Sequence, residues 1–93
     1  RLLVELDARG KEHDQILEEE RRAGLELDRA KAEMTKKLAP YFEHGEQDTR
    51  LKRFLLQTLP VQKAWKAWSI AHGAVHFSRI TLNQWRRSVG LMQ

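Results

Sequence analysis

Residues 2–38 have the sequence LLVELDARGKEHDQILEEERRAGLELDRAKAEMTKKL, and this stretch decides the fold class. It contains no proline and is rich in Glu, Lys, Arg, Ala and Leu, the residues with the strongest helix propensity. The stretch ends at Ala39-Pro40, because proline lacks a backbone N–H and disfavours helical geometry in the residue before it. We therefore expect an all-α protein that begins with one helix, roughly 55 Å long at 1.5 Å per residue.

A seven-residue pattern runs along this predicted helix. One position holds Leu2, Arg9, Ile16, Ala23 and Ala30, and the position four residues later holds Leu6, His13, Glu20, Leu27 and Met34. The apolar members suit a coiled-coil seam, whereas Arg9, His13 and Glu20 do not. Gly10 and Gly24 each cost about 1 kcal/mol relative to alanine inside a helix. The pattern thus leaves open whether the helix is continuous, kinked or broken near these glycines.

Packing against a partner is expected for residues 1–38, because a lone helix this polar is marginal in water. This favours a stalk that self-associates or docks on a partner helix over a solvated extension stabilised by its own charges. Residues 39–47, which contain Pro40 and Gly45, are predicted to be a connector.

Residues 48–93 are predicted to form a compact unit of three short helices. Asp48 is a favourable N-cap for a helix over residues 49–58, and Pro60 suits the first turn of a second helix. Ser78 is the expected N-cap of a third helix, which Gly90 would close. Three tryptophans fall on faces predicted to be buried, so we favour core packing over base stacking for Trp65, Trp68 and Trp85.

Charge is distributed unevenly between the two halves of the chain. All 13 acidic residues lie between Glu5 and Asp48, so residues 1–49, with nine basic residues, carry a net charge of −4. From Arg50 onward there are eight basic residues and no acidic ones. Such asymmetry favours a polyanionic partner or an acidic protein surface. The alternative is that the acidic half neutralises the basic half within the fold or in a dimer.

Residues 68–85, WSIAHGAVHFSRITLNQW, resemble the helix-turn-helix pattern of DNA-binding proteins. The small Ala71 lies in the first helix, Val75 and Phe77 flank the turn, and Ser78 caps the second helix. Leu82 and Trp85 complete the pattern as its buried pair. His76 stands at the turn, where that family usually has glycine. The resemblance implies a recognition helix that enters the major groove of duplex DNA.

The resemblance defines two sets of candidate DNA contacts. Candidate base contacts on the outer face of the last helix are Arg79, Asn83, Gln84 and Arg86, because Arg reads guanine and Asn or Gln reads adenine. Candidate phosphate contacts are Arg50, Lys52, Arg53, Lys63, Lys66 and Arg87. In a DNA-binding protein Arg79, Asn83 and Arg86 should be exposed together. In a docking module they should instead form salt bridges to glutamates of residues 1–38.

Two further hypotheses remain for the function. The first is a helical protein–protein interaction or scaffold module of a larger assembly, without enzymatic activity. The second is a target of a calmodulin-like protein, because residues 61–80 are basic and carry large aromatic anchors.

Several chemistries are disfavoured by the composition. The chain has no cysteine, which excludes disulfides and thiol catalysis. His72 and His76 have a spacing that can bind zinc, but no further ligand lies near them in the sequence. We therefore expect no metal, no cofactor, no small-molecule substrate and no catalytic site. No apolar run is long enough to span a membrane, and we expect an intracellular location.

Overall fold

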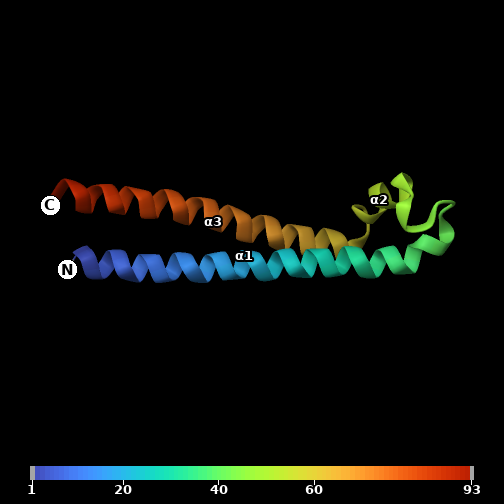
Figure 1. Cartoon of the computed structure of the whole chain (residues 1–93), viewed down its shortest axis with the longest axis horizontal. Coiled ribbons are helices and arrows are strands. Elements are labelled where there is room, and N and C mark those ends of the chain that lie inside the picture. The colour runs from blue at the N-terminus through green and yellow to red at the C-terminus, as the bar shows by residue number, and fades with distance from the viewer. Residues whose placement is uncertain (1, 93) are drawn as a thin grey trace.

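The chain folds as a long helical hairpin, shown by a computed structural model that describes residues 2–92 without the side chains of Leu2 and Met92. Its elements are α1 (Leu2–Leu38), two 3₁₀ turns (Ala39–Tyr41 and Gly45–Gln47), α2 (Thr49–Leu55) and α3 (Leu59–Met92). Helices α1 and α3 run antiparallel and side by side, so the start of α1 and the end of α3 lie at the end of the molecule that is far from α2 (Figure 1). The molecule measures 65 × 18 × 17 Å. The all-α class and the long first helix are confirmed.

Helix α1 continues through both of its glycines, so the predicted alternative of a break at Gly10 or Gly24 is wrong. Gly24 lies against α3, where a Cβ atom would sit 3.6 Å from the indole ring of Trp68. Tertiary packing along α1 therefore outweighs the modest helix propensity that the two glycines remove.

The seven-residue pattern of α1 forms the seam of an intramolecular antiparallel coiled coil. Its partner is a matching row on α3, whose members are Val61, Ala64, Trp68, Ala71, Val75, Ser78, Leu82, Trp85 and Val89. Leu27 of α1 is buried, as are Val61, Val75, Leu82 and Val89 of α3. Leu2 belongs to the predicted pattern, but its side chain lies outside the described residues. The stalk predicted from residues 1–38 therefore packs on the C-terminal half of its own chain.

Two of the three polar residues in the seam of α1 meet matching partners near the chain ends. The guanidinium of Arg9 lies 4.2 Å from the ring centroid of Trp85, a cation–π geometry. Nδ1 of His13 forms a hydrogen bond of 2.8 Å with Oγ of Ser78. The seven-residue pattern of α1 alone could not explain these side chains, because their partners lie on α3.

Glu20, the third polar seam residue, is paired with His72 of α3. Nδ1 of His72 lies 2.8 Å from the Glu20 carboxylate, and the imidazole stacks on the Trp68 indole with ring centroids 4.8 Å apart. The carboxylate is thereby held at the edge of the seam by a neighbouring donor.

The second and third helices predicted for residues 48–93 are a single helix in the structure. Residues 59–92 form α3 without interruption. There is no turn at His76, Ser78 caps nothing, and Gly90 lies within the helix. The physical reason is the seam: its seven-residue spacing runs straight through the predicted turn, and α1 offers a packing partner on both sides of it. The helix-turn-helix geometry implied for residues 68–85 is therefore absent.

Helix α2 begins at the predicted cap but is shorter than the predicted 49–58. Oδ1 of Asp48 accepts a hydrogen bond of 2.9 Å from the backbone N–H of Arg50, and Leu51 and Leu55 of α2 are buried. The Arg50 guanidinium also donates to this carboxylate, aided by the backbone N–H groups of Arg50 and His44, and lowers the pKa of Asp48 to about 2. Asp48 thus secures the end of the hairpin where α2 packs.

Candidate interaction surfaces

Helix α3 carries a second apolar row outside the seam. Ile70 and Phe77 lie seven residues apart on one side of the helix, and they expose 68% and 73% of their surface. Ile80, one turn further, exposes 46%. Between them are Gly73 and Ala74, which leave the helix backbone open to close approach. Large apolar side chains placed together at this level of exposure are typical of an interaction site.

Helix α1 presents a row of glutamates beside this apolar surface. The glutamate row consists of Glu5, Glu12, Glu19, Glu26 and Glu33, spaced by seven residues and all exposed. In an antiparallel coiled coil the corresponding flanking position of α3 faces this row, and it holds Pro60, Ala67, Ala74, Thr81 and Ser88. Five carboxylates therefore lie opposite five uncharged, mostly small residues.

Charge on the glutamate row is mostly uncompensated within the described residues. Only Glu26 has an ion pair there, at 2.9 Å from Arg29 of the same helix. The hydroxyl groups opposite the row are occupied by their own helix, since Thr81 donates to the carbonyl of Phe77 and Ser88 to that of Gln84. The sequence-based search missed this row, although the same seven-residue spacing that identified the seam could have found it.

A groove runs between the glutamate row of α1 and the facing side of α3, and we call it the acidic groove. Two open hollows lie along it. One, of about 150 Å³, is lined by Glu12, Phe77 and Thr81 among others. The other, of about 420 Å³, is lined by Glu26 and Glu33 of α1 together with residues of α3 that include Pro60 and Lys63. The acidic groove is thus a hollowed surface in which carboxylates lie beside the exposed Phe77 and beside three cations, Arg9, Arg29 and Lys63.

The flank of α3 that faces away from the acidic groove is basic. Trp65, His72, Arg79 and Arg86 follow one another at seven-residue spacing, and Asn83 lies between the two arginines. Arg79, Asn83 and Arg86 are exposed, and among residues 2–92 no carboxylate lies within ion-pair distance of either arginine. The structure therefore brings together three of the four predicted base-contact residues.

The remaining predicted DNA contacts are dispersed. Gln84 lies seven residues after Phe77 and so belongs to the acidic groove side. Arg50 is engaged by Asp48 at 3.2 Å and by Glu43 at 3.6 Å. Lys52 and Arg53 lie on α2 at one end of the hairpin, whereas Lys63, Lys66 and Arg87 are spread along α3. These cations do not form one patch.

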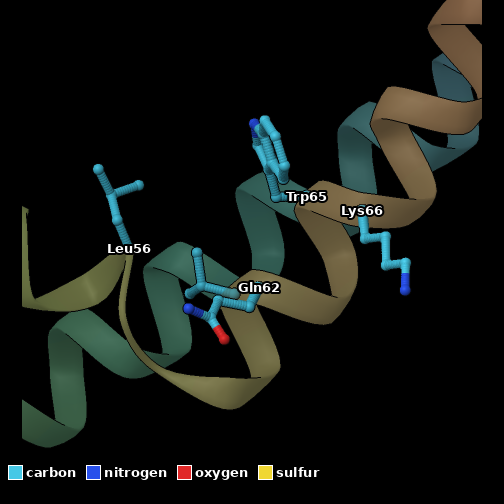
Figure 2. A pocket seen from close by; sticks show the side chains of 5 residues that line it. Leu56, Gln62, Trp65 and Lys66 are labelled. Carbon is cyan, nitrogen blue, oxygen red and sulfur yellow. The ribbon is translucent and has the colours of Figure 1, made fainter.

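A shallow pocket of about 630 Å³ lies where the α2–α3 turn meets the first turns of α3. It is lined by Leu56, Val61, Gln62, Trp65 and Lys66, and Figure 2 shows the side chains of Leu56 and Trp65 projecting on the same side of the ribbon. Trp65 is 55% exposed, so the prediction that it is buried was wrong, whereas Trp68 and Trp85 are half-buried in the seam.

Comparison of the chain with protein-family models, curated proteins and solved structures found no match. Within residues 2–92, none of the helices has both the length and the apolar composition that crossing a bilayer requires. The surfaces of the hairpin are therefore the basis for assigning a function.

Proposed function

We propose that this chain is a helical protein-interaction module, which contributes its hairpin to a larger helical assembly. One observation carries the proposal: α3 uses one face to pair with α1 and exposes a second apolar row at Ile70 and Phe77. Burying each of these side chains in a partner would contribute about 1.5–3 kcal/mol, which is a strong bias toward association.

The chemistry of the surface also favours a protein partner. The second apolar row is continuous with the acidic groove, so a partner would meet apolar side chains in the middle and charges at the edge. That arrangement is typical of protein–protein interfaces, which have an apolar core and a polar rim. Helix-in-groove docking uses the same spacing of anchors along a helix.

Site-specific photo-crosslinking in cells tests this proposal. A photoreactive amino acid replaces Phe77 in one version of the chain and Ala32, which is exposed on α1, in a matched control. We expect discrete protein adducts from position 77, with a second copy or with another protein, and background labelling from position 32. Equal labelling at both positions, or none at either, would contradict the proposal.

A second candidate function is binding of nucleic acid, and one observation favours it. Arg79, Asn83 and Arg86 are exposed on one flank of α3, which contains no acidic residue to neutralise them. Without a helix-turn-helix, this flank could contact the phosphate backbone along the helix, an interaction that is largely independent of sequence.

Duplex DNA binding measured across salt concentrations tests the second candidate. Binding should weaken steeply between about 50 and 200 mM salt, and Arg79→Ala should reduce the slope of log affinity against log salt by about one. Lys36→Ala, an exposed cation on α1, is the matched control and should leave the slope unchanged. The hypothesis fails if the wild-type chain shows no salt-sensitive binding.

The calmodulin-like partner considered for residues 61–80 is disfavoured by the geometry. Val61 is buried and Trp68 half-buried in the seam with α1, so these two anchors are available to a partner only if the hairpin opens. Such an interaction would require calcium, which distinguishes it from the two candidates above.

A further inference from the structure

We propose that the partner of the acidic groove is a second copy of this chain, so that two hairpins pack through this groove as a symmetric dimer. The inference rests on the proposed function and deepens it, because it assigns an occupant to the apolar row at Ile70 and Phe77. Its basis is that both complementary surfaces occur on the same chain.

The apolar part of the interface is self-complementary. Ile70 and Phe77 lie two turns apart on α3, with Gly73 and Ala74 in the turn between them, and Ile80 lies one turn beyond Phe77. Two α3 helices can approach closely at the small residues while the large side chains of each pack beside the other. A contact that uses the same patch on both molecules is what a two-fold symmetric dimer requires.

The charged part of the interface is complementary between copies. Lys66 and Arg87 lie at the same helical position of α3 as Ile80, on the outer border of the apolar row. Both are exposed, and neither has an ion pair among the described residues. When the apolar rows of two copies face each other, the cations of one α3 border the glutamate row of the opposite α1.

The glutamate row then has a structural explanation. Positions that flank a coiled-coil seam commonly pair with opposite charges on the neighbouring helix. In this hairpin the facing positions of α3 are uncharged, so these positions offer the row no cation across its own seam. In the dimer, the same carboxylates flank a second helix–helix contact and meet cations there.

Sedimentation equilibrium of the intact chain tests the dimer. The wild type should be dimeric at micromolar concentrations, and its dissociation constant should rise with salt. Phe77→Glu should abolish dimerisation over the measured range without loss of helix content, because Phe77 lies outside the seam. A monomeric wild type at all concentrations would overturn the inference.

Matched charge removals locate the interface. Glu12→Gln with Glu33→Gln should weaken the dimer by roughly fourfold to several hundredfold, because the two-fold symmetry repeats each contact and four partly exposed ion pairs are lost. Asp14→Asn with Asp28→Asn removes the same charge from the other side of α1 and should leave the dissociation constant unchanged. Equal effects of the two pairs would contradict the assignment of the groove.

Charge reversal gives the sharpest result. Glu12→Lys with Glu33→Lys makes one variant, and Lys66→Glu with Arg87→Glu makes another. Each should be monomeric alone, because like charges face each other in its homodimer, whereas a mixture should form a heterodimer in which both contacts are attractive. If the mixture stays monomeric, the inference is wrong.

The two proposals fail in different ways. Failure of the dimer together with adducts from position 77 to another protein would overturn the second copy as partner and leave the interaction module intact. Failure of the dimer together with background labelling at position 77 would overturn both.

Discussion

The two ends of the hairpin are stabilised by different means. At the closed end, Leu51 and Val61 are almost fully buried and Asp48 caps α2. At the open end, near the chain termini, the seam contains the pairs Arg9–Trp85 and His13–Ser78. Apolar burial thus contributes at both ends, through Leu82 and Val89 at the open end. The open end differs because polar pairs in its seam also fix which residues face each other.

Truncating the buried core of the closed end should have the largest effect. Leu51 is 0% exposed, so Leu51→Ala should lower the free energy of unfolding by about 2–5 kcal/mol through lost burial and the cavity left behind. Chemical denaturation followed by circular dichroism measures the change. Leu25→Ala, on the exposed side of α1, is the matched control and should cost well under half as much. Similar costs at the two positions would contradict the assigned core.

Truncation at the open end should have a smaller and more local effect. Trp85 is half-buried beside Arg9, so Trp85→Ala should cost about 1–3 kcal/mol, less than a fully buried aromatic residue. Amide hydrogen exchange should accelerate near the chain ends and remain unchanged in α2, because the two ends open independently. Uniform acceleration along the chain would show that the two ends are one cooperative unit.

The pairing of His13 with Ser78 should contribute a measurable coupling. A double-mutant cycle with His13→Ala and Ser78→Ala should give an interaction energy of about 0.5–1.5 kcal/mol, typical of one hydrogen bond inside a protein. Free energies of unfolding of the wild type, both single variants and the double variant supply the cycle. Additive single effects would mean that the two side chains do not interact in solution.

Acidification should produce a change confined to the closed end. The folded-state pKa of Asp48 is lowered to about 2, below its ordinary value of 3.8. Its contribution is therefore complete above about pH 4 and is lost as the pH falls toward 2. Asp48→Asn should flatten the pH dependence of the unfolding free energy in this window. An unchanged pH dependence would contradict the ionised cap.

The first helix was largely predictable from the sequence, and so was its packing face. Proline-free composition set the length of α1, and the apolar members of the repeat, such as Ile16 and Leu27, identified the seam. Asp48 was recognised as a cap because its residue type and position carry local information. These features depend on short-range chemistry that a single stretch of sequence contains.

The second long helix was not predicted, because local signals competed with a tertiary one. Ser78 has the residue type of an N-cap, and Gly73 and Gly90 suggest helix ends, so each signal favoured a division of α3. The seam spacing from Val61 to Val89 continues through Gly73 and Ser78 and was the stronger signal. Ser78 faces His13 of α1, a partner that no local pattern reveals.

Small-angle X-ray scattering of the monomeric fraction, eluted directly from a sizing column, tests the central claim that α3 is one helix paired along α1. The hairpin has a Cα radius of gyration of 19.5 Å, and the measured value should lie close to it. A compact globular domain of this length would give about 12 Å. A value near that figure would contradict the extended antiparallel hairpin.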